Sequence, residues 1–395
     1  MRVAIVGDFP RDPNRIQGGV EAVVAYLAKG LTAFADLEVH TVTLKPRLAQ
    51  EQTVEWAGVT AHYVPASFRF ANLTQHRVNK QRLQATLTHI APDVVHAHIA
   101  GVYAQLAAVF GQPWLLTVHG IRYREAALWP GPINRFRQQV IAHLERDSIA
   151  RAGHIIAISP YVEEEFSRNI QGQVYRLENP IDERFFALHD REWPDTVLFV
   201  GRIIPRKGAF ELVKAIEQIR REAPDLQLRM AGGPLESQAP GYMAMIEDYV
   251  RTHDLSRHVT FLGQVSEDDM FNEYASCVLM ALPARQETAP MAIQEAMAAG
   301  KAVVSTRVGG IPYLVDHDRT GLLVESGDVD GLATAIATLL RDDNLRRSMG
   351  QAAKAEAEHR FQANRVAART REIYYQILNQ PVPAIKHTAI DAVSG

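Results

Sequence analysis

Short apolar runs alternate with amphipathic stretches along the whole chain, a pattern that predicts parallel strands connected by helices. The apolar runs of the first half predict strands at residues 3–6, 39–44, 59–64, 94–97, 114–118, 155–158 and 174–177. A second series predicts strands at residues 197–200, 228–230, 259–262, 278–281 and 303–304. Two such series predict an α/β protein with two Rossmann-like domains.

The same pattern divides the chain. Residues 181–195 are charged, bounded by prolines and without an apolar period, so we expect a linker there. It would separate an N-terminal domain at 1–180 from a C-terminal domain at 196–361. Residues 362–380 predict a terminal helix, and residues 381–395 a loose tail. In this architecture a ligand binds outside the carboxyl ends of the strands, in the cleft between the domains.

One uncharged stretch, residues 99–118, is about long enough to span a bilayer. Gly111-Gln112-Pro113 interrupts it, so we predict a helix followed by a strand and no membrane span. The apolar run at residues 3–6 is too short for a signal peptide.

Two glutamates flank a predicted helix start in the second half. Residues 287–300 read ETAPMAIQEAMAAG. Pro290 suits a first helical turn, and Gly300 is placed to end the helix. Glu287 would then precede the helix and Glu295 lie within it, on the order of 10 Å away. Such a pair suits an elongated ligand, although two solvated surface glutamates would have the same spacing.

The backbone at this helix start is also a candidate site. The N–H groups of Ala289, Met291 and Ala292 would have no partner within the helix. Free N–H groups at a helix N-terminus attract anions such as phosphate.

Residues 287–300 resemble the paired-glutamate signature of retaining glycosyltransferases with the GT-B fold, in particular glycosyltransferase family four. The motifs VGGIP at 308–312 and TGLLV at 320–324 follow in the order that this family has. The resemblance implies two Rossmann-like domains whose parallel sheets face each other across a cleft, with a C-terminal helix that crosses back to the N-terminal domain.

The resemblance also implies a reaction. A sugar would move from a nucleotide-sugar to a hydroxyl acceptor with retention of configuration and no covalent intermediate. UDP-sugars are the commonest donors of the family and GDP-mannose comes next. Glu287 would support the sugar ring and Glu295 bind the ribose hydroxyls. Thr288, Ala289 and Met291 would offer N–H groups to the sugar or the distal phosphate.

A basic motif follows the first strand of the second series. Residues 201–208 read GRIIPRKG, and Arg202 and Lys207 can bind phosphate oxygens. This motif is similar to the diphosphate clamp of the family, whereas a solvated basic loop would be the plain alternative. We expect Arg206 to face solvent. Because side-chain cations can stabilise a departing diphosphate, we expect no metal and no cofactor.

Paired glycines follow the first strand of the chain. Gly18 and Gly19 precede a predicted helix and would let the backbone approach a ligand closely. By resemblance, Gly19 would contact donor phosphate or acceptor and Gly18 would lie on the acceptor side, although a plain turn has the same sequence. The motif is not the Gly-x-Gly-x-x-Gly of NAD enzymes, which argues against a dehydrogenase.

Histidines end two strands of the first series. His119 follows residues 114–118 and would point into the cleft, where the resemblance gives its position a contact with the transferred sugar. A histidine bonded to nearby backbone is the alternative. His96 and His98 share a face of the preceding strand. His98 would reach the acceptor side or pack in the core.

Weaker signals complete the predicted site. Gly233, in a turn after a strand, would lie beside the nucleotide, and the resemblance implies that Gln264 and Val265 pack against its base. The Asp-x-Asp segments 316–318 and 328–330 have the form of metal-binding motifs, but each lies in an expected turn or helix cap, so we predict no metal site there.

Composition limits the partners. The net charge of −3 over 395 residues argues against nucleic acid. The single cysteine, Cys277, suits a reducing compartment, so we expect a cytoplasmic protein. Residues 69–151 contain ten Lys or Arg and four Asp or Glu, with Phe68, Phe70, Trp129 and Phe136 among them. This stretch predicts either peripheral contact with the inner face of an anionic membrane or a solvated basic surface.

The resemblance to family four implies a glycosyltransferase of cell-surface polysaccharide, glycolipid or other glycoconjugate biosynthesis. Its acceptor would be a saccharide, a lipid-linked molecule or a small molecule with a hydroxyl group. Two alternatives remain open: a sugar-nucleotide epimerase with the same fold, and a non-catalytic protein that binds nucleotide-sugars.

Overall fold

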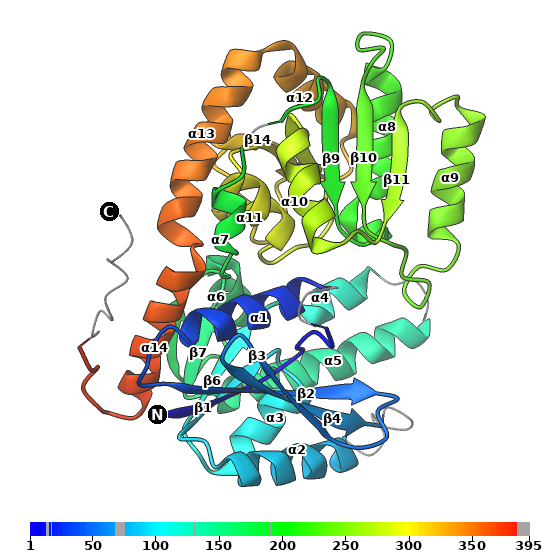
Figure 1. Cartoon of the computed structure of the whole chain (residues 1–395). Coiled ribbons are helices and arrows are strands. Elements are labelled where there is room, and N and C mark those ends of the chain that lie inside the picture. Colours follow the sequence, from blue (N-terminus) through cyan, green and yellow to red (C-terminus); the bar gives the residue numbers. More distant parts are fainter. Residues whose placement is uncertain (13–15, 17, 68–75, 129–131, 190, 385–395) are drawn as a thin grey trace, which may run out of the picture.

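The computed structural model describes residues 1–384 except 13–15, 17, 68–75, 129–131 and 190. Each half of the described chain forms one sheet covered by helices (Figure 1). The predicted α/β class with two Rossmann-like domains is confirmed. Phe68, Phe70 and Trp129, which the sequence singled out, lie outside the described residues, as do residues 385–395 of the expected tail.

The first sheet has the strand order β3-β4-β2-β1-β5-β6-β7-β8. Its strands are β1 (Arg2–Val6), β2 (Glu38–Pro46), β3 (Gln52–Trp56), β4 (Val59–Ala66), β5 (Val94–His98), β6 (Trp114–Val118), β7 (His154–Ala157) and β8 (Gln173–Arg176). All neighbours are parallel except β3 and β4. The sequence did not predict β3, because this edge strand is largely exposed and has no apolar run.

The second sheet is entirely parallel, in the order β11-β10-β9-β12-β13-β14. Its strands are β9 (Thr196–Val200), β10 (Gln227–Ala231), β11 (Val259–Gly263), β12 (Leu279–Leu282), β13 (Ala302–Thr306) and β14 (Gly321–Val324). β9 and β13 are buried along their whole length, as expected for strands covered on both faces. β14 had been noted only as a motif.

Helices connect the strands. In the first half they are α1 (Gly19–Leu31), α2 (Arg77–Ile90), α3 (Val102–Phe110), α4 (Arg122–Ala127), α5 (Pro132–Arg151), α6 (Pro160–Phe166) and α7 (Glu183–Phe186). In the second half they are α8 (Ala209–Ile219), α9 (Tyr242–Thr252), α10 (Glu267–Ser276), α11 (Met291–Ala298), α12 (Val329–Arg341), α13 (Asp343–Arg360) and α14 (Ala363–Ile377). The expected break between residues 99 and 118 separates α3 from β6.

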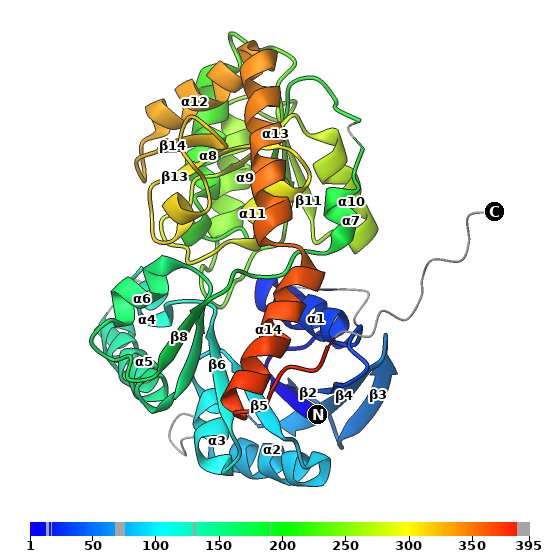
Figure 2. The ribbon, with the colours of Figure 1, turned by 90° about the vertical axis from the view of Figure 1, so that its left-hand side faces the viewer.

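The terminal helix crosses back onto the first domain. Figure 2 shows α13 running down the second domain and continuing into α14 beside α1. The two helices pack so closely that a Cβ at Gly30 would lie 2.9 Å from Cβ of Ala367. Arg371 Nε also donates to Asp36 Oδ2 at 2.9 Å. The predicted crossing helix is therefore confirmed, and it ties the second domain to the first.

Candidate functional site

Two adjoining cavities lie where the strand ends of the two sheets meet. The larger has a volume of about 760 Å³ and the smaller about 350 Å³. Gly19, Arg206, Lys207 and Met291 line both. The cavities therefore meet at the start of α1, the short turn Pro205–Lys207 after β9, and the start of α11.

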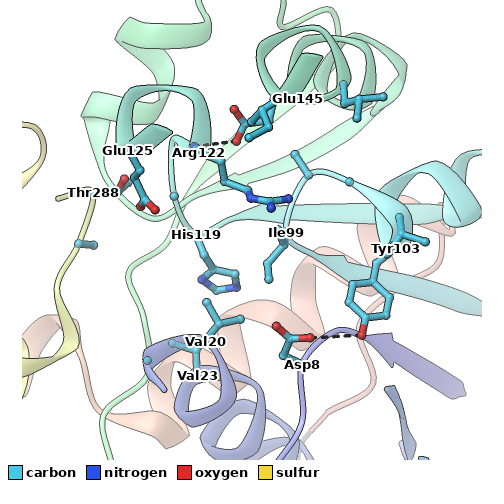
Figure 3. A pocket seen from close by; sticks show the side chains of 18 of the residues that line it. Asp8, Val20, Val23, Ile99, Tyr103, His119, Arg122, Glu125, Glu145 and Thr288 are labelled. Atoms are coloured by element: carbon cyan, nitrogen blue, oxygen red, sulfur yellow. Dashed lines mark hydrogen bonds between the residues drawn. The ribbon is translucent and has the colours of Figure 1, made fainter. Parts of the chain in front are cut away.

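The residues predicted from the sequence divide between these cavities. Those on the larger cavity are Gly19, His119, Lys207, Glu287, Thr288, Ala289 and Met291. Those on the smaller cavity are Gly18, Gly19, Arg202, Lys207, Gly233, Gln264, Val265, Met291 and Glu295. His98 belongs to neither lining and is fully buried behind His119. Figure 3 shows the larger cavity with His119 near its centre.

The loop that carries Glu287 rests on a glycine pair. A Cβ at Gly310 would lie only 1.8 Å from the carbonyl oxygen of Thr288, so no larger residue fits. The N–H of Gly310 donates to the carbonyl oxygen of Glu287 at 3.0 Å. The VGGIP motif thus holds the backbone of the glutamate loop in place. We expected Pro290 in the first turn of the helix; it is the N-cap residue, and α11 begins at Met291.

Glu287 is a buried carboxylate with two cations. Its Oε1 lies 2.6 Å from Arg206 Nη1 and 2.6 Å from Lys207 Nζ. Burial alone would raise the pKa of Glu287, but Arg206 and Lys207 outweigh burial and hold this pKa below its ordinary value. The carboxylate is therefore ionised at neutral pH.

The expectation that Arg206 faces solvent is wrong. Its side chain is 20% exposed, and Nη1 also donates to the carbonyl oxygen of Gln286 at 3.0 Å. A carboxylate as buried as Glu287 needs close positive charge, and Arg206 supplies it together with Lys207. Arg206 Nη1 also lies 3.7 Å from Glu125 Oε1 of α4, so it bridges the two domains across the larger cavity.

Glu295 has the opposite electrostatic environment. It lies on α11 one turn after Met291, and its Oε2 accepts a hydrogen bond of 2.8 Å from the hydroxyl of Tyr274. Burial raises the pKa of Glu295 to about 7, although the Tyr274 hydrogen bond lowers it. The two glutamates of one motif therefore differ in protonation near neutral pH. Environments that separate the pKa values of two carboxyl groups in this way are typical of acids with separate roles.

Asn179 is a site residue that the sequence did not reveal. It follows β8, is 3% exposed and lines the larger cavity. Its Nδ2 donates to the carbonyl oxygen of Ala289 at 3.3 Å and to Gln294 Oε1 at 3.5 Å, so it connects the first domain to the glutamate loop. We had placed residue 179 next to the linker. The available signal was weak, because Asn179 is one of two polar residues between Leu177 and the apolar pair Pro180-Ile181.

The far wall of the larger cavity contains further residues that we did not predict. Asp8, two residues after the end of β1, accepts a hydrogen bond of 3.3 Å from the hydroxyl of Tyr103, and burial raises its pKa (Figure 3). Glu145 of α5 accepts hydrogen bonds from the N–H groups of Arg122 and Tyr123 at 2.8 and 2.9 Å. Burial raises the pKa of Glu145 to about 8. The position of Asp8 at a strand end could have revealed it.

The two Asp-x-Asp segments have structural roles. Asp328 caps α12 by accepting from the N–H of Gly331 at 2.8 Å. Asp316 accepts from Arg319 in a turn. Across the described part of the chain, no group of three or more His, Cys, Asp or Glu side chains is placed to hold a metal ion.

The basic stretch at residues 69–151 contributes α5 to the rim of the larger cavity. Phe136 on this helix is 70% exposed, and Val140, which is 39% exposed, lines the cavity. Among the helices that are described, none is both long and apolar enough to traverse a bilayer.

Two family models match the chain in succession. "Glycosyltransferase Family 4" matches residues 17–185, and "Glycosyl transferases group 1" matches residues 180–356. Together they account for most of the chain.

Curated relatives and a solved structure agree with these matches. An uncharacterised glycosyltransferase of Methanocaldococcus jannaschii is 26% identical over 91% of this chain and 95% of its own. A D-inositol 3-phosphate glycosyltransferase of Paenarthrobacter aurescens is 27% identical over 92% and 94%. The structure of sucrose-phosphate synthase from Thermosynechococcus elongatus superposes with a TM-score of 0.82 at 23% identity, covering 96% of this chain and 99% of that one.

Proposed function

Because the chain belongs to glycosyltransferase family 4 and has the GT-B fold, we propose that it transfers a sugar from a nucleotide-sugar to a hydroxyl acceptor with retention of configuration. The observation that carries this proposal is the position of Lys207. Its side chain lies where the two cavities meet, and Nζ is 2.6 Å from the Glu287 carboxylate. A cation at this junction suits a diphosphate that joins a nucleoside in one cavity to a sugar in the other.

The smaller cavity would hold the nucleoside. Gln264 and Val265 would pack against the base, and Glu295 would accept hydrogen bonds from the ribose hydroxyls. Gly233 lines the same wall and leaves room for the ligand. Arg202 and Lys207 would bind the diphosphate, together with the N–H groups at the start of α1 near Gly19.

The larger cavity would hold the transferred sugar next to Glu287, His119 and Asn179. In the reaction, the bond between the anomeric carbon and the phosphate oxygen breaks, and the acceptor oxygen bonds to the same face of that carbon. The departing phosphate oxygen takes the proton of the acceptor hydroxyl. The ionised Glu287 would stabilise positive charge on the sugar ring, and Lys207 would stabilise negative charge on the leaving group. The N–H groups of Thr288, Ala289 and Met291 would bind the sugar or the distal phosphate.

These side-chain cations support a reaction without a metal. Arg202 and Lys207 would provide the positive charge that a divalent ion supplies to a diphosphate elsewhere. Activity should therefore persist after treatment with EDTA and desalting. Complete loss of activity that manganese restores would contradict this part of the proposal.

The acceptor would enter the larger cavity beyond His119, on the side of Asp8 and Arg122. Gly18, which we expected on the acceptor side, lines the smaller cavity instead. Arg122 points into this space, where an acceptor with a negatively charged group would bind it (Figure 3). One relative that matches nearly the full chain is named D-inositol 3-phosphate glycosyltransferase, a name that contains a phosphorylated compound. With Phe136 and Val140 exposed at the rim, a lipid-linked acceptor could be taken from the inner face of a membrane, so we place the enzyme in the cytoplasm with peripheral membrane contact.

The donor would be a UDP-sugar first and GDP-mannose second, and the product a polysaccharide, glycolipid or other glycoconjugate. The test is to incubate the purified protein with a panel of UDP- and GDP-sugars and hydroxyl acceptors. We expect release of nucleoside diphosphate only when an acceptor is present, and NMR of the product should show the anomeric configuration of the donor.

Other results would favour the alternatives. Conversion of the donor to a different sugar-nucleotide, without release of nucleoside diphosphate, would indicate an epimerase. Donor binding without turnover across the panel would indicate a non-catalytic binding protein. An inverted product would contradict retention while leaving glycosyl transfer in place.

A further inference from the structure

Strand β5 carries two buried histidines that lie behind His119. His96 and His98 are both fully buried, and their ring centroids are 4.3 Å apart. Each ring nitrogen of His96 has a partner at 2.7 Å: Nδ1 contacts the hydroxyl of Tyr374 on α14, and Nε2 contacts Oγ1 of Thr117. His96 therefore anchors the crossing helix to the first sheet. His98 has a different set of contacts.

His98 contacts the site through one ring nitrogen only. Its Nδ1 lies 2.7 Å from Nε2 of His119, and the two ring planes differ by 21°. The backbone at Gly7 packs closely against this residue, because a Cβ at Gly7 would lie 2.9 Å from Cβ of His98. Nε2 of His98 is buried and has no hydrogen-bond partner among the described residues. The contact with His119 is thus the one hydrogen bond of this ring within the described structure.

These contacts favour one arrangement of protons. Burial lowers the pKa of His98 well below its ordinary value and that of His119 to about 4, so both rings are neutral at pH 7. A neutral imidazole has one N–H. If His98 carried it on Nε2, a buried donor would be unpaired, which costs more than an unpaired acceptor. The proton therefore belongs on Nδ1 of His98, which donates to Nε2 of His119.

We propose that His98 is a positioning residue that fixes the tautomer of His119. Because Nε2 of His119 accepts from His98, the proton of His119 is on Nδ1. Nδ1–H is then the one donor of His119, and a ligand oxygen in the larger cavity would take the place of Asn179 as its acceptor. His119 would be a neutral hydrogen-bond donor to a sugar oxygen, and an unprotonated Nδ1 would be a mismatch there. The last step rests on the proposed function, whereas the tautomer does not.

The Asn179 side chain agrees with this direction of hydrogen bonding. It raises the pKa of His119 against the effect of burial, as an amide oxygen near a ring N–H does. Its Nδ2 donates to Ala289 and Gln294, so Oδ1, which is buried and has no hydrogen-bond partner among the described residues, is the atom that is left to accept from His119. Hydrogen bonds would thus be donated in one direction: from His98 to His119, from His119 to Asn179, and from Asn179 to the glutamate loop of the second domain.

The tautomer can be measured directly in the free protein. In protein labelled with 15N-histidine, two-bond 15N–1H spectra distinguish a protonated from an unprotonated ring nitrogen, and the His119→Asn variant identifies the signals of His119. We expect Nδ1 protonated and Nε2 unprotonated at pH 7. A His119 protonated on Nε2 would overturn the proposal. Since no substrate is present, this result does not depend on whether the chain transfers sugars.

Variants of His98 test the consequence for turnover. His98→Leu removes the donor and should lower kcat roughly tenfold with little change in donor KM, the low end of what losing an orienting partner typically does. His98→Asn keeps an N–H close to the position of Nδ1 and should recover most of the kcat.

The control is His62→Leu. His62 is a buried histidine in the same sheet, its Nε2 lies 3.2 Å from Nδ1 of His40, and it lines neither cavity. Its kcat should stay within threefold of wild type. An equal loss of kcat in His98→Leu and His62→Leu, or in His98→Leu and His98→Asn, would mean that His98 only supports the fold, and the positioning role would be rejected.

Discussion

The two halves of the molecule build their share of the site in different ways. The second half uses contiguous segments at strand ends, namely residues 201–208, 263–265 and 287–295. The first half uses residues at the ends of strands that are far apart in sequence, such as Asp8, Ile99 and His119. Sheet order brings these together, because β1, β5 and β6 are neighbours in the first sheet.

This difference follows from what each side would bind. A nucleoside diphosphate is the part that donors share, and it can be held by backbone N–H groups, glycine turns and fixed cations, all of which are local in sequence. An acceptor is recognised by side chains that converge from several strands. We therefore expect substitutions on the second half to affect transfer from every donor and substitutions on the far wall of the first half to affect the choice of acceptor.

Lys207→Ala should have the largest effect. The change removes the cation between the cavities and one of the two positive groups that keep Glu287 ionised. One preorganised charge on a leaving group is typically worth about 3 kcal/mol, so kcat should fall roughly 100-fold.

The control is Lys214→Ala on α8, because Lys214 lies over the ring of Phe210 at 4.3 Å and lines neither cavity. It should keep wild-type turnover. A kcat within threefold of wild type in Lys207→Ala would show that the leaving group is stabilised elsewhere. It would contradict the assignment of the donor diphosphate to Lys207 of the second half.

Glu287→Gln and Glu295→Gln should separate chemistry from donor binding. Glu287 lies beside the proposed sugar position, so its loss should lower kcat roughly 100-fold and leave the affinity for nucleoside diphosphate nearly unchanged. Glu295 would bind ribose equally in the ground and transition states, so its loss should raise donor KM with little change in kcat.

Titration calorimetry with UDP and GDP measures the affinity of both variants. We expect weaker binding only in Glu295→Gln. Equal losses of affinity in the two variants would mean that the glutamates do not divide the ligand between the cavities, and the roles assigned to them would be withdrawn.

The sequence predicted the second half of the site better than the first, for a physical reason. Lys207, Glu287 and Glu295 belong to motifs that are contiguous in the sequence, so the segments that carry them could be recognised there. Asn179 could not be found in this way, since its partners Ala289 and Gln294 are more than one hundred residues away in the chain. We expected Arg206 to face solvent because the sequence does not show that Glu287 is buried. That burial results from the packing of the glutamate loop on Gly310, which is distant from Arg206 in the chain.

The fold has the same division between local and distant information. Buried strands such as β1 and β9 are apolar along their length and were predicted from that run. β3 was missed because an edge strand gains its hydrogen bonds from one neighbour, β4, and keeps its side chains in solvent. Pairing of this kind depends on the partner strand and leaves little trace in the apolar pattern.

Donor affinity should depend on pH through Glu295. Burial raises its pKa to about 7, so this carboxyl keeps its proton between about pH 5 and 7, where an ordinary glutamate has lost it. The ionised form accepts two ribose hydrogen bonds, so affinity for a nucleotide-sugar should rise with pH up to about 7 and level off above it. Below the pKa, the loss should approach tenfold per pH unit.

The measurement is calorimetry with UDP-glucose or GDP-mannose between pH 5.5 and 8.5, because the diphosphate diesters of these donors do not titrate in that range. Glu295→Gln is the control and should give a flat profile. A wild-type profile that is equally flat would show that Glu295 does not bind the ribose in its ionised form.

Arg122→Gln should have the smallest effect and should affect only the acceptor. Its side chain points into the larger cavity on the side away from the glutamate loop, so its loss should raise the KM of a negatively charged acceptor roughly fivefold, as expected for one partly solvated charged hydrogen bond. Donor KM should not change.

Arg124→Gln is the matched control, because Arg124 lies on the same helix, pairs with Glu165 at 3.0 Å and lines neither cavity. The decisive comparison uses a phosphorylated acceptor and its unphosphorylated analogue: Arg122→Gln should reduce the preference for the phosphorylated form. If both variants keep that preference, or if Arg122→Gln weakens the donor as much as the acceptor, the division into a donor half and an acceptor half does not hold at this wall of the cavity.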